Sequence, residues 1–322
     1  MNKKTATIII ILISLIILTL VIRFKTGSSK TIEVAVITYV THPVLNNIKN
    51  SFEQELKELM NEKDIDYRLV EFNAQGVDDN LHSISKQVLS TSPFLVLTIS
   101  TPVSQFLMRQ ADNEQKIVYS FVTNPDDLGE DLTRTNSTGI SDAVNYTENI
   151  ELINYILGDS ITIGMLYNPS EPNSVYGINK VKQIISQSPS KLITATVTKE
   201  SEIPTSINQI LNKVDVIYVG GDNTVVGNIT SVISRAHQNN IPVFASDEGS
   251  VKSGALCGVS VDYNELGRET AVIVYRIING ENPKNIKRKK LEGKKLLINR
   301  KAYDQLKIEF PNEVTNRAEF VD

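Results

Sequence analysis

The sequence is poor in the residues from which many functional sites are built. It contains one cysteine, Cys257, among 322 residues, so an intramolecular disulfide framework and a cysteine-based zinc cluster are excluded. Its three histidines (His42, His82 and His237) are scattered, without the short spacing of metal ligands. It has no tryptophan, so any aromatic ring in a binding site has to come from tyrosine or phenylalanine. We therefore predict no metal site.

The chain also lacks an excess of positive charge. Its net charge is −4, which argues against a nucleic-acid partner held mainly through phosphate contacts. The first 30 residues carry five bases and no acid, whereas the remainder is acidic. Hydrophobic residues make up 41% and charged residues 22%, as in ordinary globular proteins. At roughly 100–200 residues per domain, the length suggests two domains.

Sequence signatures of common enzymes are absent as well. There is no Gly-x-x-x-x-Gly-Lys-Ser/Thr loop, no Gly-x-Gly-x-x-Gly turn after a strand and no Gly-x-Ser-x-Gly elbow. Two Ser-x-x-Lys matches, beginning at Ser83 and Ser188, lack the partner motifs and are attributed to chance. Cys257 lies in an apolar segment and reads as a core residue. The sequence therefore favours a protein that is not an enzyme and that uses no cofactor.

A hydrophobic segment stands near the N-terminus. Lys3 and Lys4 precede an almost unbroken apolar run over residues 6–22, and Arg23 and Lys25 follow it. The run is longer than most signal-peptide cores, no small-x-small cleavage site follows, and no cysteine is present to carry a lipid. We predict that residues 1–30 form a single transmembrane anchor with a short linker at 26–30. A cleaved signal peptide and a buried core helix remain as alternatives.

The rest of the chain alternates between strand-like and helix-like segments, and the rhythm is repeated once. The first series predicts strands at 32–39, 67–72, 94–99 and 117–121 and helices at 46–60, 79–89 and 102–109. The second predicts strands at 161–167, 191–197, 214–219 and 242–245 and helices at 175–185, 206–211 and 225–237. This pattern indicates an α/β fold with two lobes, each a doubly wound parallel sheet.

The C-terminal part departs from the repeat. A strand at 255–261 and a helix at 264–279 are followed by a basic stretch over residues 284–301, with nine bases and one acid. An apolar segment at 296–298 reads as a strand. The bases fit an exposed edge strand, where lysine is common. Contact with anionic lipid near the anchor is the alternative.

Six loops follow the predicted strands, at the edge where open parallel sheets bind ligands. They span residues 41–43, 100–102, 123–125, 168–174, 220–224 and 246–250, and they are rich in short polar side chains. Such residues also cap helices, so one loop alone means little. Free N–H groups at helix starts suit a carboxylate, and Asp222, Asp247 and Glu248 suit an ammonium group. An α-amino acid fits this chemistry better than a sugar or a phosphate.

Several stretches at these loops resemble a known family, the ABC-transporter substrate-binding proteins of the tryptophan/aromatic-amino-acid-binding type. The matching stretches are residues 37–45 (ITYVTHPVL), 72–76 (FNAQG), 101–102 (TP), 121–125 (FVTNP), 139–144 (GISDAV), 164–175 (GMLYNPSEPNSV), 218–225 (YVGGDNTV), 247–255 (DEGSVKSGA) and 261–267 (VDYNELG). The resemblance implies a type I periplasmic-binding-protein fold with three crossover strands. It further implies capture of a small ligand between the lobes, delivery to a membrane permease with a cytosolic ATPase, and an extracytoplasmic binding domain.

On this basis we expect lobe one at residues 31–142 plus 257–284 and lobe two at 143–256 plus 285–322. Hydrogen bonds from lobe one are assigned to Thr101, Thr123 and Asn124. Asn173 and Ser174, at a helix start, are expected to take the ligand carboxylate. Asp222, Asn223 and Asp247 are expected to hold its ammonium group or to order the loops around it. Tyr39 and Tyr167, at strand ends, flank an aromatic ring or pack in the core.

Two functions from other classes stay open. The same fold serves in a membrane-anchored sensory module that signals through a partner protein. An extracytoplasmic α/β enzyme is the third reading.

Overall fold

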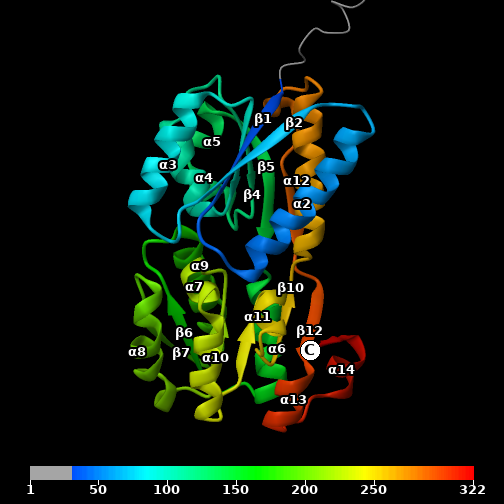
Figure 1. The fold of residues 1–322 in the computed structure, drawn as a ribbon. Helices are drawn as coiled ribbons and strands as arrows, with labels where there is room; N and C mark the ends of the chain where they lie inside the picture. Colours follow the sequence, from blue (N-terminus) through cyan, green and yellow to red (C-terminus); the bar gives the residue numbers. More distant parts are fainter. Residues whose placement is uncertain (1–30) are drawn as a thin grey trace, which may run out of the picture.

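The computed structural model describes residues 31–322 (Figure 1). The predicted transmembrane anchor, at residues 1–30, lies outside these residues. Across 31–322, no helix combines the length and the apolar character needed to cross a bilayer.

The first sheet takes six strands from residues 31–322, in the order β11-β5-β4-β3-β1-β2, and every neighbouring pair is parallel. These strands are β1 (Ile32–Thr38), β2 (Tyr67–Asn73), β3 (Leu95–Ile99), β4 (Lys116–Ser120), β5 (Asn136–Ala143) and β11 (Lys289–Glu292). The central strands are continuous apolar runs because helices cover both faces of such a sheet; every residue of β3 is buried.

The second sheet takes seven strands from the same part of the chain, in the order β13-β12-β10-β9-β8-β6-β7. They are β6 (Thr162–Tyr167), β7 (Lys191–Thr196), β8 (Val216–Val219), β9 (Val243–Ala245), β10 (Cys257–Ser260), β12 (Lys295–Asn299) and β13 (Glu319–Val321). Neighbours are parallel except β10 and β12, which run antiparallel. The predicted α/β architecture with two parallel-sheet lobes is therefore confirmed.

Helices pack around both sheets. Those of the first lobe are α2 (Pro43–Asn61), α3 (Asp78–Thr91), α4 (Thr101–Gln110), α5 (Asp131–Arg134) and α12 (Tyr263–Ile278). Those of the second are α6 (Tyr146–Leu157), α7 (Pro172–Ile185), α8 (Ile203–Asn208), α9 (Asn223–Gly227), α10 (Ile229–Gln238), α11 (Glu248–Lys252), α13 (Arg300–Leu306) and α14 (Asn312–Arg317). Helix α12 returns from the second lobe to lie against α2 (Figure 1). A Cβ at Gly267 of α12 would come within 2.4 Å of the Ile48 carbonyl oxygen, so this close crossing requires glycine.

The chain passes between the sheets three times: after β5, after β10 and after β11. Two segments differ from the predicted lobe division. Strand β10 had been expected in lobe one but pairs with β9 and β12 of the second sheet. Strand β11 had been expected in lobe two but pairs with β5 at the edge of the first sheet. Its edge position explains two of the lysines in the basic stretch, Lys289 and Lys290, which are exposed.

Most predicted elements match the structure within a few residues, and two differences have clear causes. The expected helix at 225–237 is divided into α9 and α10, because Asn228 leaves helical geometry (φ −121°, ψ 27°). Strand β5 was not predicted because its sequence, NSTGISDA, is largely polar. Its hydroxyls are nevertheless buried and bonded; Thr138, for example, donates to the Ile286 carbonyl.

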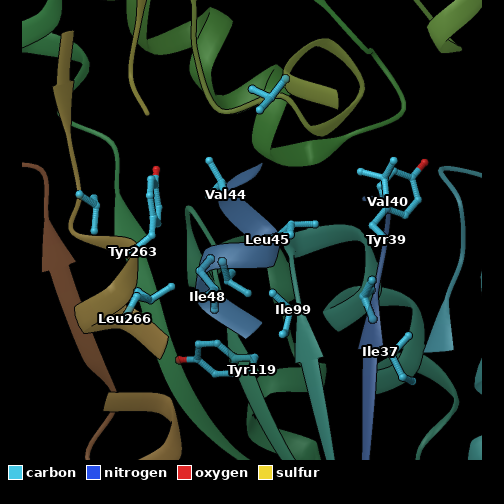
Figure 2. Packing of buried hydrophobic residues seen from close by; sticks show 14 of the residues in the cluster. Ile37, Tyr39, Val40, Val44, Leu45, Ile48, Ile99, Tyr119, Tyr263 and Leu266 are labelled. Carbon is cyan, nitrogen blue, oxygen red and sulfur yellow. The ribbon is translucent and has the colours of Figure 1, made fainter. Parts of the chain in front are cut away.

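One hydrophobic cluster runs from the core of the first lobe into the second. It joins Val40 and Val44 near the start of α2 to Val225, Val226 and Val251 on the second lobe. Figure 2 shows Val40, Val44 and Tyr263 at the end of the first-lobe core that faces the second lobe. The two lobes are thus in direct apolar contact in this conformation.

Candidate ligand-binding site

A cavity lies where the carboxyl ends of the two sheets face each other. Its lining comes from both lobes: His42, Val44, Thr101, Phe121, Thr123 and Tyr263 on one side and Asn173, Gly220, Gly221, Asp222, Asn223, Val226, Ser246 and Asp247 on the other, with Asp142 of β5 beside the first crossover. About 360 Å³ of space that no atom fills, open solvent included, lies around these residues. The space is narrow, because the centre of a water molecule has only about 20 Å³ in which to move. A larger ligand therefore requires the walls to separate.

Apart from Asp142 at the first crossover, the wall from the first lobe is neutral and aromatic. The ring of Phe121 meets His42 and Tyr263 edge to face, with centroids 6.3 Å and 5.5 Å apart. Thr101, the first residue of α4, accepts a hydrogen bond from the Thr123 backbone N–H through its hydroxyl (3.4 Å). This wall offers ring faces and edges for an aromatic ligand, together with hydroxyl groups.

Two residues of this wall hold backbone conformations that are rare outside glycine. Ser100, just before Thr101, has φ 110°, and Phe121 has φ 58°. Such conformations cost about 1–3 kcal/mol each and gather at binding and active sites. Their positions, immediately after β3 and β4, turn the chain so that Thr101 and Phe121 reach the cavity.

The wall from the second lobe is organised by Glu171, which is buried just before α7. Its carboxylate accepts five hydrogen bonds from three residues, namely Asn173, Asn223 and Thr224. Two of these donors are backbone N–H groups at the start of α9. Glu171 thus fixes two loops of this wall relative to each other.

Asp222 has a similar structural role. One carboxylate oxygen caps α9 through the Val225 N–H (2.7 Å), and the other accepts from the Asn168 N–H (2.6 Å) and the Ser174 hydroxyl (2.5 Å). Burial, and next the nearby charge of Glu171, raises the pKa of Asp222 to about 7. Both oxygens are engaged, so Asp222 orders the loops.

Three other side chains present oxygens without a protein partner. Asp247 caps α11 through one oxygen, which accepts from the Ser250 N–H (2.7 Å), but its Oδ2 has no hydrogen-bond partner within residues 31–322. The same is true, over the described chain, of Asp142 Oδ1 and Asn173 Oδ1. The Asn173 amide is oriented, because its Nδ2 donates to Glu171 and to the Gly221 carbonyl. All three residues are at most 4% exposed.

Burial is the main influence on the charge of these carboxyls. It raises the pKa of Asp142 to about 8, although Thr123 and the backbone partly oppose the shift. It also raises the pKa of Asp247, against the opposing hydrogen bonds from Ser250. No lysine or arginine among residues 31–322 lines the cavity. Buried carboxyls without a counter-cation favour a ligand that brings one.

A direct hydrogen bond joins the two walls. The Nδ1 atom of His42 accepts from the Leu45 N–H at the start of α2, so its Nε2 carries the proton and faces Asn223 Oδ1 at 3.4 Å. Burial lowers the pKa of His42 to about 4, which keeps the ring neutral near pH 7. His42 therefore contributes a bond between the lobes.

The structure brings together six of the ten residues predicted for the site. They are Thr101, Thr123, Asn173, Asp222, Asn223 and Asp247, all of which line the cavity. Ser174 does not line the cavity, but its hydroxyl donates a hydrogen bond to Asp222, which does. Asn124 instead caps a short 3-10 helix (Pro125–Leu128).

The two tyrosines expected to flank an aromatic ring do not line the cavity. The Tyr39 hydroxyl lies 3.4 Å from the Gly76 carbonyl and 3.3 Å from Asp78, and Tyr167 packs against the core of the second lobe. Phe121 and Tyr263 are the aromatic residues that line the cavity instead. Sequence reasoning missed these two, and it missed Asp142 and Glu171 as well. All four fall in stretches that resemble the family (FVTNP, VDYNELG, GISDAV and GMLYNPSEPNSV).

Comparison with known proteins gives a consistent result. The family model for "ABC transporter substrate binding protein" matches residues 33–321. A tyrosine-binding protein of Clostridioides difficile is 30% identical over 296 residues, covering 89% of this chain and 85% of its own. The crystal structure of an ABC domain in complex with L-Trp from Streptococcus pneumonia is 27% identical, with a TM-score of 0.84 over 91% of this chain and 100% of the other.

A third relative differs in conformation. It is the ligand-free, open structure of a substrate binding protein with adhesive properties from Clostridium difficile, 26% identical, with a TM-score of 0.64 over 91% of this chain and 99% of the other. Sequence identity and coverage are nearly the same as for the L-Trp complex, yet the TM-score, which measures structural similarity, is lower. The arrangement of the lobes is therefore closer to the L-Trp complex than to this open form, in keeping with the narrow cavity.

Proposed function

This chain belongs to the family of ABC transporter substrate binding proteins, and on that premise we propose that it captures an aromatic amino acid between its two lobes and delivers it to a membrane permease driven by a cytosolic ATPase. The observation that carries the proposal is a cavity lined from both lobes, with aromatic rings on the first-lobe wall and a buried, unpaired carboxyl from each lobe, Asp142 and Asp247. The tyrosine-binding and L-Trp-bound relatives support an aromatic amino acid as the ligand.

The two lobes move as separate bodies in this proposal. From the strand pairing, we assign residues 31–143 plus 262–293 to the first lobe and 144–261 plus 294–322 to the second. Three connections between them act as the hinge, and the ligand drives closure because it contacts both walls at once. The hydrogen bond between His42 and Asn223 forms in the closed state only.

Within the cavity, the roles follow from the hydrogen-bonding groups that remain free. Thr101 and Thr123 bind the ligand from the first lobe, and the backbone N–H at the start of α7, at Asn173, receives its carboxylate, whereas the side-chain Oδ1 of Asn173 faces its ammonium group. Asp247 receives its ammonium group, while Asp222 and Ser174 hold the loops in place. Phe121 and Tyr263 contact its ring.

The proposal includes the place of the protein in the cell. The binding domain faces the outside of the cytoplasmic membrane, and residues 1–30 attach it there as a single-pass anchor. A test is fractionation of cells before and after treatment with alkali: a membrane-anchored chain stays with the membrane, and a cleaved chain is recovered in solution.

The function itself is tested by calorimetry of the purified full-length protein against the common amino acids. We expect one or more aromatic L-amino acids to bind with micromolar or tighter affinity and to be recovered unchanged. Turnover of the ligand would point to an enzyme instead. Failure of every aromatic amino acid to bind would remove the ligand class while leaving the family assignment in place.

A further inference from the structure

The side chains that line the cavity leave more hydrogen-bond acceptors than amide or imidazole donors free for a ligand. Its amide and imidazole donors are already used within the protein: Asn173 Nδ2 by Glu171 and Gly221, Asn223 Nδ2 by Glu171, and His42 Nε2 by Asn223. By contrast, three oxygens on cavity-lining residues are buried with no partner within residues 31–322, those of Asp142, Asn173 and Asp247. Two of the three belong to carboxyl groups. The cavity therefore lacks donors that carry positive charge.

A primary ammonium group supplies what is missing. It has three N–H donors and one positive charge, which match three acceptor oxygens and two acidic side chains. A ligand carboxylate finds a poorer environment. With no lysine or arginine among the described residues of the lining, only hydroxyls and backbone N–H groups can receive it, beside Asp142 and Asp247.

We infer that this site recognises a ligand chiefly through its primary ammonium group, and that its ligands include aromatic monoamines that have no carboxylate. The inference rests on the proposed function and extends it to a second chemical class. The three unpartnered oxygens hold the ammonium group. The ring lies toward Phe121 and Tyr263, which form the aromatic side of the same cavity (Figure 2 shows Tyr263 facing the second lobe).

The test is a comparison of three ligands that share one ring, measured by calorimetry on the full-length protein at pH 8. They are L-tyrosine, tyramine, which lacks the carboxylate, and hydroxyphenylpropionate, which lacks the ammonium group. The same series with L-tryptophan, tryptamine and indolepropionate is run in parallel. We expect each amine to bind within about tenfold of its amino acid. We expect each acid to bind at least a hundredfold more weakly, because it leaves the buried oxygens unpaired.

Two variants connect this selectivity to the proposed oxygens. Asp247→Asn keeps an oxygen to cap α11 but removes the charge, and it should weaken tyramine binding at least tenfold. Asp142→Asn removes the charge of the other carboxyl and should also weaken tyramine binding. It provides the test if Asp247→Asn fails to fold. Asp304→Asn, an exposed position on α13, is the matched control and should leave the affinity unchanged.

The outcomes separate the two proposals. If an amino acid binds but its amine is weaker by more than tenfold, or if its acid binds within tenfold, the ammonium inference is overturned and the proposed function stands. If both carboxyl variants bind tyramine as well as the control does, the inference is also overturned. If no member of either series binds, the proposed function fails.

Discussion

The two walls of the cavity differ in almost every physical respect. Apart from the carboxyl of Asp142, the first lobe contributes neutral rings and hydroxyls, held by a strained backbone at Ser100 and Phe121. The second contributes acids and amides, held by a dense hydrogen-bond network around Glu171 and Asp222. A ligand that is apolar at one end and cationic at the other can satisfy both walls only when they close on it. The difference therefore sets the orientation of the ligand and couples its binding to closure.

The largest effect is expected from damage to the polar wall. Glu171→Ala leaves several buried donors of Asn173, Asn223 and Thr224 unpaired, and each costs about 1–3 kcal/mol. We expect the free energy of unfolding in urea to fall by at least about 3 kcal/mol. The exposed variant Glu309→Ala should stay within about 0.5 kcal/mol of the wild type. A similarly small loss for Glu171→Ala would show that the network is not what holds this wall.

The second prediction separates ligand binding from structural support within the same wall. Asp247→Ala removes an oxygen that has no protein partner in the described chain, and we expect amino-acid binding to weaken at least tenfold. Breaking a buried charge pair costs about 2–5 kcal/mol. Calorimetry measures the affinity, and urea unfolding measures the smaller stability loss of about 1 kcal/mol from the missing cap of α11. Unchanged affinity would remove Asp247 from the site.

The pH dependence tests the carboxyl at the crossover. Burial raises the pKa of Asp142 from its ordinary 3.8 to about 8, and a bound ammonium group lowers it again. Binding should therefore release a proton, and affinity should rise between pH 6 and pH 8, by up to about tenfold per pH unit. Calorimetry in buffers of different ionisation enthalpy measures the protons released.

Without ligand, pH has the opposite effect on Asp142: its contribution to the stability of the folded protein falls as the pH rises. The raised pKa gives Asp142 a contribution to stability that is full below about pH 4 and is lost as the pH rises to about 8. His42, whose pKa is lowered to about 4, acts in the other direction between pH 4 and 6.5, and Asp222 and Asp247 act with Asp142. Asp142→Asn isolates the first contribution: the stability of the variant relative to wild type should rise with pH. A pH-independent difference would show that Asp142 does not titrate in this range.

The smallest effect is expected from the aromatic wall. Phe121→Leu keeps an apolar side chain but removes the edge-to-face contacts with His42 and Tyr263. We expect the affinity for an aromatic ligand to fall by about 0.5–1.5 kcal/mol, or roughly 2- to 12-fold. Binding should weaken in the same proportion for the amino acid and its amine, because the ring is common to both. A loss confined to one of them would place the ring elsewhere.

Much of this arrangement could be predicted from the sequence. The alternation of strands and helices gave both sheets, and the polar loops after the strands brought Thr101, Thr123, Asn173 and Asp247 to one cavity. Spacing could not say which acids are free. Asp222 and Asp247 are both caps of short helices, but Asn168 and Ser174 occupy the second oxygen of Asp222 alone. That distinction depends on contacts between loops far apart in the chain.

The aromatic wall was the harder part to predict. Tyr39 and Tyr167 stand at strand ends, but their side chains turn into local packing, which the strand pattern does not reveal. Phe121 reaches the cavity through a positive φ, and Tyr263 does so at the start of a helix that has just crossed between lobes. The predicted lobe division was wrong for β10 and β11, because the sheet that each strand joins depends on pairing between distant segments.

A crystal structure of the protein with a bound aromatic amino acid or its amine tests the central claim most directly. We predict the ligand nitrogen about 3 Å from Asp142 Oδ1, Asn173 Oδ1 and Asp247 Oδ2, with the ring against Phe121 and Tyr263. A nitrogen directed away from these oxygens, or a ligand bound outside the cavity between the lobes, would contradict the account.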